Sequence, residues 1–409
     1  MVEKGLKKKI QMAHFNPGRN IGVGDFIFSN KEKKYIRQVI KSNRLSYGPL
    51  TQKFEVLFSQ EHGCKFGVFC NSGTSALHIA LAALKEKYKW QDKDEVIVPA
   101  ITFIATSNIV LHNNMQPVFV DVDKNTYNIN PALIEEKITD RTKAIIPVHL
   151  FGMPADMFPI MKICRKYHLR IIEDSCETMF ASYKSKKVGS FGDIGCFSTY
   201  IAHFLVTGIG GLCITDNDEL AVMIRSLINH GRDSIYIGID DDKKQGKSLF
   251  EVVDRRFKFI RLGHSFRATE IEAAIGLGQL ERKDDIISKR RTNGRYLTEG
   301  LSDLDNFLQL PCVPKDRDHN FMMYPIVIKR GNKKKLVYFL EKNLIETRDM
   351  MPLLNQPLYT KLFGKKEDEF PVAKWINHNG FYIGCHQYLK KVELDYIIDK
   401  FHEFYKKWQ

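Results

Sequence analysis

Short apolar segments alternate with helical patterns in the first half of the chain, and this alternation restricts the possible folds more than any other feature. The apolar segments are largely β-branched and span residues 65–70, 96–98, 117–120, 144–148 and 170–172. Helical patterns lie between them at 76–87, 102–111, 131–137 and 157–167. Apolar strands that alternate with helices predict an α/β fold with a doubly wound, mostly parallel sheet.

Polar and aromatic residues follow several of these strands, at the edge where parallel sheets bind ligands. Phe103, His149 and Asp174 stand at or just beyond such ends, as does the turn 71–75, Asn-Ser-Gly-Thr-Ser. A strand, a small polar turn and a helix N-terminus form an anion site, because free N–H groups and the helix dipole point at the ligand. The turn is equally compatible with an ordinary helix N-cap by one of its hydroxyl groups.

The stretch 189–216, GSFGDIGCFSTYIAHFLVTGIGGLCITD, has the pattern of a strand, a turn and a second strand. The hydroxyls of Ser198, Thr199 and Thr207 lie close in sequence to His203, and a glycine run leads into the second strand. Glycine-rich turns allow the positive φ angles and the close backbone approach that a phosphate-bearing ligand requires. By itself the stretch indicates a phosphate turn beside a histidine.

Composition argues against several classes of protein. None of the eight cysteines forms a C-x-x-C pair, so neither a zinc knuckle nor a four-cysteine iron–sulfur cluster is indicated, and reduced, buried thiols fit a cytoplasmic protein. No apolar run approaches the ~18 residues of a membrane span, and no apolar region follows the basic start as in a secretory signal. The formal charge of +14 is spread out, without the exposed aromatics of a nucleic-acid interface. We interpret the charge runs as solvated faces, or more weakly as steering of an anionic substrate such as a nucleotide-sugar diphosphate.

The pattern changes near residue 320, where the sequence indicates a small α+β domain. Its expected strands lie at 321–329 and 345–348, and its helices at 333–342 and 392–407. We therefore expect an N-terminal arm (1–25), a large domain that binds the cofactor discussed below (26–290) and a small C-terminal domain (291–409). An insertion-like segment, 238–250, lies within an irregular excursion between 231 and 258.

Seven long motifs occur in order between residues 71 and 280, and the match that they carry runs from about Phe26 to the C-terminus. They are NSGTSALHIAL, DEVIVPAITFIATSNIV, PVFVDVD, IIPVHLFGMPADM, IIEDSCETMFASYKSKKVGSFGDIGCFS, GIGGLCITD and GHSFRATEIEAAIGLGQL. Together they resemble the DegT/DnrJ/StrS sugar aminotransferase family. The resemblance implies fold type I of the pyridoxal-phosphate enzymes, and a substrate that is a nucleotide-linked sugar.

The resemblance also implies roles for individual residues. Asp174 matches the aspartate that faces the pyridine nitrogen of the cofactor, where a carboxylate keeps that nitrogen protonated and the ring acts as an electron sink. Phe103 matches the aromatic residue that stacks on the ring. Short hydroxyls and N–H groups would hold the phosphate through charge-assisted hydrogen bonds, and the matching positions are Ser72, Gly73, Thr74 and Ser198.

Two further matches differ from the common family pattern. Glu177 stands where many members have a glutamine near the phenolic oxygen of the cofactor. Ser265 stands where many have an asparagine that reaches the phosphate of the neighbouring subunit. The resemblance therefore implies a homodimer with shared active sites.

The departure with the largest chemical consequence is His203. In the aminotransferases, a lysine five residues after the phosphate-binding serine forms a Schiff base with the cofactor, and counting from Ser198 this position is His203. A histidine cannot form that bond, but it can act as a general acid or base near neutral pH. The family has a branch with this exchange, the 3-dehydratases of 4-keto-6-deoxy nucleotide sugars, which hold pyridoxamine phosphate noncovalently. We therefore expect a 3-dehydratase that uses glutamate as amino donor and carries no iron–sulfur cluster.

Three positions differ from that branch, and they leave alternatives open. Phe204 stands where those enzymes often have a second histidine, Ile209 where the family has a glutamate, and Met179 where it has a histidine. The alternatives are a sugar aminotransferase that uses glutamate, and a non-catalytic sugar-nucleotide-binding paralogue. Arg348 and His386 lie in segments that face the substrate in related proteins, and each is equally compatible with a structural role.

Overall fold

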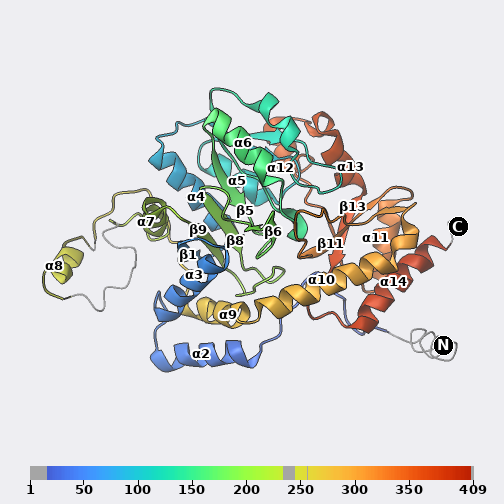
Figure 1. Ribbon diagram of the computed structural model, residues 1–409, viewed down its shortest axis with the longest axis horizontal. Coiled ribbons are helices and arrows are strands. Elements are labelled where there is room, and N and C mark those ends of the chain that lie inside the picture. The colour runs from blue at the N-terminus through green and yellow to red at the C-terminus, as the bar shows by residue number, and fades with distance from the viewer. Residues whose placement is uncertain (1–15, 234–244, 256, 407–409) are drawn as a thin grey trace.

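A seven-stranded sheet forms the centre of the computed structural model, which describes residues 16–233, 245–255 and 257–406 (Figure 1). The strand order is β1-β9-β8-β5-β4-β2-β3. In that order the strands are Phe66–Cys70, Gly211–Thr215, Ile194–Ser198, Arg170–Asp174, Thr142–Ile145, Glu95–Pro99 and Gln116–Val120. Pairing is parallel from β8 to β3, whereas β9 is antiparallel to both of its neighbours. The expectation of a doubly wound, mostly parallel α/β sheet is confirmed.

Successive residues on the central strands point to opposite faces of the sheet, and each face carries its own hydrophobic core. On β2, Val96 and Val98 pack in one core and Ile97 in the other. On β5, Ile172 and Ile171 divide in the same way. Strands that are buried on both faces therefore read as continuous apolar runs, which is why the sequence revealed them.

Helices cover both faces of this sheet. On one face pack α3 (Pro49–Glu61), α4 (Gly73–Lys87), α7 (Asp218–Leu227) and α9 (Glu270–Leu280), and on the other α6 (Met157–Tyr167). The further helices around the sheet are α2 (Asn30–Ser42) and α5 (Ile104–His112). The expected helix at 131–137 is instead two short 3-10 turns, because Asn130 caps the first turn and Ile134 closes it by an i→i+3 bond.

A second sheet of four antiparallel strands lies toward the C-terminus, in the order β10-β11-β13-β12. These strands are Leu308–Gln309, Met323–Ile328, Gly380–Gly384 and Thr347–Asp349. The helices of this region are α11 (Lys333–Lys342), α12 (Pro357–Phe363), α13 (Pro371–Asn379) and α14 (Lys391–Tyr405).

Helix α10 (Lys283–Gly300) connects the regions of the two sheets (Figure 1). Its Ile286 packs in the core of the large sheet, whereas Leu297 packs in the core of the small one. Residues after 300 also return to the large core, among them Met350 and Tyr359. The division of the chain after residue 290 falls inside this helix and stays a prediction.

Helix α8 (Gly246–Arg255) lies well away from the rest of the ribbon in Figure 1. The expectation of an irregular segment between 231 and 258 is wrong for residues 246–255, which form this helix. The first part of the insertion-like segment, up to residue 244, lies outside the described residues, as do residues 1–15 of the expected N-terminal arm.

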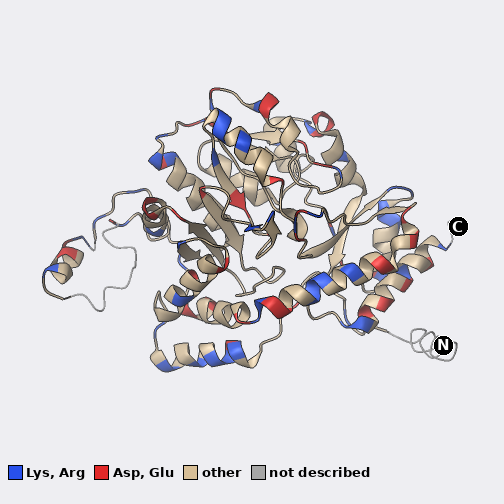
Figure 2. Ribbon diagram, viewed as in Figure 1, with Lys and Arg blue, Asp and Glu red and all other residues tan. Residues whose placement is uncertain are grey.

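Basic and acidic residues are interspersed along outer helices in Figure 2, for example along α10. This distribution fits the interpretation of the charge runs as solvated faces. Within the described part of the chain, every helix is too short or too polar to cross a bilayer.

Candidate active site

A cavity of about 370 Å³ lies at the carboxyl ends of β5 and β8, where the fold predicts a ligand. It gathers residues that are far apart in the sequence. Eight of the residues expected at the site line it: Ser72, Gly73, Thr74, Phe103, Asp174, Glu177, Ser198 and His203.

The loop 199–210 reverses the chain between β8 and β9. Because these strands are antiparallel neighbours, they need no crossover helix, and the loop stays at the carboxyl edge of β8. The loop is closed by a hydrogen bond from the Thr199 N–H to the Gly210 carbonyl (2.9 Å) and by one between the Thr199 and Thr207 hydroxyls (2.6 Å). Both threonines are buried and neither lines the cavity, so of Ser198, Thr199 and Thr207 only Ser198 does.

His203 projects from this loop with a defined tautomer. Its Nδ1 lies 3.0 Å from the carbonyl oxygen of Ser198. A carbonyl oxygen only accepts hydrogen bonds, so Nδ1 carries the proton and Nε2 keeps a free lone pair. Burial, with a smaller effect of the Arg290 charge, lowers the pKa of His203 to about 4, although the hydrogen bond to Ser198 opposes the shift. The imidazole is therefore neutral at pH 7 and can accept a proton at Nε2.

The N-terminus of α4 meets the end of β8. Ser72 caps the helix, accepting a hydrogen bond from the Ser75 N–H at 3.0 Å. A Cβ on Gly73 would lie 2.6 Å from the Cβ of Ser198, so only glycine lets the two segments touch. The first turn of a helix has N–H groups without intrahelical partners. The N-cap and the anion site are thus compatible features of one turn.

Asp174 is the last residue of β5 and has 4% of its surface exposed. Its carboxylate accepts hydrogen bonds from the Thr106 hydroxyl (2.7 Å) and the Cys176 N–H (3.1 Å). Burial raises the pKa of Asp174 although these bonds oppose the shift. Within the described ranges it forms no ion pair with lysine or arginine. A buried carboxylate without a cationic partner suits a ligand that brings a positive charge.

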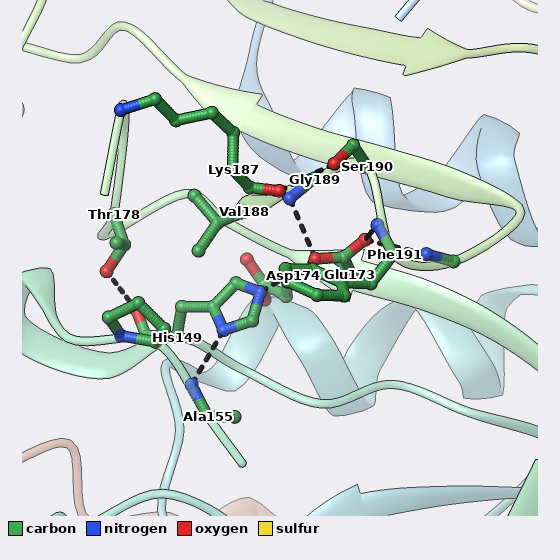
Figure 3. A network of polar contacts seen from close by, with 12 residues as sticks. His149, Ala155, Glu173, Asp174, Thr178, Lys187, Val188, Gly189, Ser190 and Phe191 are labelled. Atoms are coloured by element: carbon green, nitrogen blue, oxygen red, sulfur yellow. Dashed lines mark hydrogen bonds and ion pairs between the residues drawn. The ribbon is translucent and has the colours of Figure 1, made fainter. Parts of the chain in front are cut away.

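The strand end that carries Asp174 is fixed by its neighbour Glu173 (Figure 3). This fully buried carboxylate accepts hydrogen bonds from the N–H groups of Gly189 (2.7 Å), Phe191 (2.6 Å) and Gly192 (2.8 Å). His149 adds a contact through Nε2 at 3.0 Å, while its Nδ1 accepts from a backbone N–H. His149 therefore supports the strand end and does not line the cavity.

Two further residues differ in exposure. Glu177 is buried and accepts a hydrogen bond from the Phe151 N–H (3.0 Å), and burial raises the pKa of Glu177 to about 7, with a smaller effect of Asp174. Phe103 precedes α5 and has 56% of its surface exposed, which is unusual for a phenylalanine. An exposed ring on the wall of a cavity is suited to stack on a planar ligand.

The groups on the cavity wall fit a pyridoxal-type cofactor. A helix N-terminus with adjacent hydroxyls suits a phosphate, the exposed ring of Phe103 suits an aromatic ring, and the unpaired carboxylate of Asp174 suits a protonated ring nitrogen. No lysine lines the cavity in the described part of the chain.

Three predicted site residues lie elsewhere. Ser265 is bridged to Asn229 and accepts a hydrogen bond from Arg267 (3.1 Å). Arg348 pairs with Glu346 and donates to a backbone carbonyl. His386 is buried, with its Nδ1 accepting from the N–H of Tyr388, so here the structural role is the observed one.

Of the three positions that depart from the dehydratase branch, only one lines the cavity. Phe204 and Met179 are fully buried, whereas Ile209 lines the cavity. Other lining residues were missed by the sequence analysis. They come from the loop and from the C-terminal region: Tyr200, Met322, Met323, Met351 and Tyr382. A tyrosine or methionine in a strand pattern carries no local signal that it faces a ligand.

Comparisons with known proteins agree with this arrangement. A model described as the DegT/DnrJ/EryC1/StrS aminotransferase family matches residues 27–402. The GDP-perosamine synthase of Caulobacter vibrioides is 34% identical over 372 residues, which cover 90% of this chain and 93% of that protein.

Two solved structures have closely similar folds. One is an Escherichia coli GDP-4-keto-6-deoxy-D-mannose-3-dehydratase with bound hydrated PLP, with TM-score 0.83 and 28% identity, covering 93% of this chain and 99% of that one. The other is Helicobacter pylori PseC, an aminotransferase of pseudoaminic acid biosynthesis, with TM-score 0.84 and 25% identity, covering 95% of this chain and 100% of that one.

The Thr106–Asp174 bond generates a prediction about cofactor binding. We expect Thr106→Val to weaken the binding of pyridoxal phosphate about tenfold, because it removes a hydrogen bond that stabilises the buried carboxylate of Asp174. Thr102→Val is the matched control, since the Thr102 hydroxyl contacts that of Thr106 (2.7 Å) rather than the carboxylate of Asp174. Equilibrium titration measures both affinities, and equal losses in the two variants would contradict the assigned role.

Proposed function

The chain belongs to the DegT/DnrJ/EryC1/StrS aminotransferase family, and from this premise we propose that it removes the C3 hydroxyl of a nucleotide-linked 4-keto sugar, with His203 as the acid–base residue. It is a pyridoxal-phosphate-dependent enzyme of nucleotide-sugar chemistry, in a family with both aminotransferase and dehydratase members. The choice of a 3-dehydratase, and the noncovalent binding of the cofactor, are our proposals.

One observation carries the choice. Where the sequence pattern of the aminotransferases has a lysine, His203 lines the cavity, and no lysine in the described residues replaces it. The imidazole holds a proton on Nδ1 and has a free Nε2. This arrangement supports proton transfer without a covalent bond between protein and cofactor.

The other residues of the cavity have separate tasks in this proposal. Ser72, Gly73, Thr74 and Ser198 bind the phosphate, Phe103 packs on the ring, and Asp174 keeps the ring nitrogen protonated. When bound, the cofactor withdraws electrons from the substrate carbon next to the departing hydroxyl. Nε2 of His203 accepts the proton that must be removed and returns it to the leaving hydroxyl, which departs as water.

A sugar aminotransferase is the second candidate. The whole-chain similarity to PseC favours it, as do Phe204 and Ile209, which depart from the dehydratase pattern. Both reactions use the nucleotide sugar and glutamate. They differ in whether the glutamate nitrogen is released as ammonia or is retained on the sugar.

We also propose that the enzyme works as a homodimer. A groove of about 830 Å³ adjoins the candidate active site at Thr74, and its wall includes Leu262 and His264, which precede Ser265. Leu262 has 94% of its surface exposed. The chain just before Leu262 exposes further apolar side chains, at Phe257, Phe259 and Ile260. An apolar surface of this extent beside an open site supports a second copy as its cover.

The dimer proposal predicts a sedimentation mass of two chains. Leu262→Glu should shift the equilibrium toward the monomer, because it places a charge in the covered surface. Tyr338→Ser is the control, since Tyr338 has 72% of its surface exposed on α11, in the small-sheet region. A wild-type protein that sediments as one chain at micromolar concentration contradicts the proposal.

The proposed role of His203 predicts a different effect for each of two substitutions. His203→Gln should reduce turnover about 10²–10⁴-fold because it removes the acid–base group, while the phosphate cup still retains the cofactor. His203→Lys should create a borohydride-reducible adduct to the protein, detectable by mass spectrometry. A stoichiometric lysine adduct in the wild-type protein would refute noncovalent binding.

The reaction itself is tested by incubation with a GDP- or dTDP-linked 4-keto-6-deoxy sugar and glutamate. Dehydration converts the sugar and glutamate into a 3-deoxy keto sugar, 2-oxoglutarate and ammonia, in equal amounts. Transamination gives an amino sugar and 2-oxoglutarate without ammonia. We expect ammonia to form in step with 2-oxoglutarate, measured by coupled assays and mass spectrometry of the sugar. An amino sugar supports the second candidate, and binding of the nucleotide sugar without turnover supports a non-catalytic paralogue.

A further inference from the structure

Arg290 lies in the middle of α10 with 1% of its surface exposed. Its guanidinium donates hydrogen bonds to neutral acceptors, and within the described residues it forms no ion pair. A buried arginine is costly unless its N–H groups are satisfied, so a fully buried one without a carboxylate needs an explanation.

The acceptors of Arg290 belong to three separate segments. Nη1 donates to the carbonyl oxygens of Met322 (2.6 Å) and Phe321 (3.3 Å), just before β11. Nε donates to the side-chain oxygen of Gln387, beyond β13 (2.9 Å). Nη2 donates to the carbonyl oxygen of His203 (3.2 Å).

The guanidinium also lies over the ring of Phe204, 5.0 Å from its centroid. It therefore contacts two consecutive residues of the loop 199–210. Met322, which Arg290 holds on the other side, lines the candidate active site. One side chain thus joins the residue proposed for catalysis to the wall of the cavity contributed by the C-terminal region.

A second buried arginine, Arg225, has the ordinary structural role, in which a carboxylate neutralises the buried charge. Arg225 on α7 donates to both carboxylate oxygens of Glu55, at 3.0 and 3.3 Å, and so forms a neutralised pair. Neither residue lines the candidate active site. Arg290 instead retains an uncompensated charge next to the loop that carries His203.

We propose that Arg290 is a positioning residue, which fixes the backbone of His203 against the C-terminal region and so holds the imidazole in its Nδ1–H form. The inference rests on the proposed role of His203. A planar fork with several N–H groups can hold carbonyls of different segments at once, which an ammonium group cannot do in the same geometry.

The electrostatic part of the role follows from the groups around the two residues. Around His203, the cavity wall contributes Asp174, Cys176, Glu177, Tyr200 and Tyr382. Around Arg290 lie the Cys385 thiol, the Tyr388 hydroxyl and His386. Arg290 is the cation that acts on His203, and its charge lowers the pKa of that imidazole beyond the effect of burial.

Two substitutions separate the charge from the geometry. Arg290→Met removes the positive charge, so protonation of His203 becomes easier and the acid limb of the pH profile of kcat/KM should move upward from about pH 4 by about one unit. Arg290→Lys keeps the charge, so the limb should stay in place. Both should lower kcat about tenfold with little change in KM, because the imidazole loses its fixed position.

Arg291→Met is the matched control. Arg291 is the next residue of α10, but it is partly exposed and pairs with Asp318 (3.1 Å) and Asn320. Its loss should leave both kcat and the acid limb unchanged. A purely structural role for Arg290 would lower stability and the yield of active enzyme without moving the limb.

A direct titration distinguishes this inference from the proposed function. In protein labelled with ¹³C-histidine, the resonance of His203, assigned with His203→Gln, should titrate at higher pH in Arg290→Met than in the wild type. If that shift occurs and no turnover is found with any keto sugar, the proposed function fails and the inference stands.

Two results would overturn the inference. One is an unchanged His203 titration in Arg290→Met. The other is wild-type kcat in Arg290→Lys, which remains decisive if Arg290→Met does not fold.

Discussion

The buried carboxylate of Glu173 is the interaction on which the candidate active site depends. Three backbone N–H groups from residues 189–192 and the imidazole of His149 meet on it. Burying a charge is unfavourable unless its hydrogen bonds are satisfied, and here every donor comes from a segment that must lie beside the end of β5. The next residue, Asp174, therefore faces the cavity from a fixed strand end, while the turn held by Glu173 leads directly into β8, Ser198 and His203.

The electrostatics of the cavity follow from the same geometry. Its wall carries two carboxyls and an imidazole. Burial raises the pKa of Asp174 and of Glu177 and lowers that of His203. The positive charge that acts on His203 belongs to Arg290, which is held outside the cavity by neutral acceptors. Such an arrangement suits a ligand with a cationic ring, and it leaves one basic nitrogen, Nε2 of His203, for proton transfer.

Local patterns predicted much of the fold and those site residues that lie at strand ends and helix starts. Continuous apolar runs revealed the strands because residues such as Ile171 and Ile172 are buried on opposite faces of the sheet. The turn 71–75, Asp174 and Ser198 were found because strand ends and helix starts have local signatures. The helix at 246–255 was missed. Its buried Val252 stands among exposed apolar neighbours, so the sequence there lacks the clear division between a buried and a solvated face that indicates a helix.

By itself the sequence determined the class of fold, the family resemblance, and the replacement of the expected lysine by His203, because each depends on residue types at short spacing. Only the tertiary structure decided that Thr199 and Thr207 close a loop, that Arg348 and His386 do not line the cavity, and that Met322 and Tyr382 do. It alone also placed Arg290 against the carbonyl of His203, 87 residues away in sequence. The physical reason is that a contact between distant segments is set by how helices and sheets pack, and this packing leaves no pattern in the local sequence on either side of the contact.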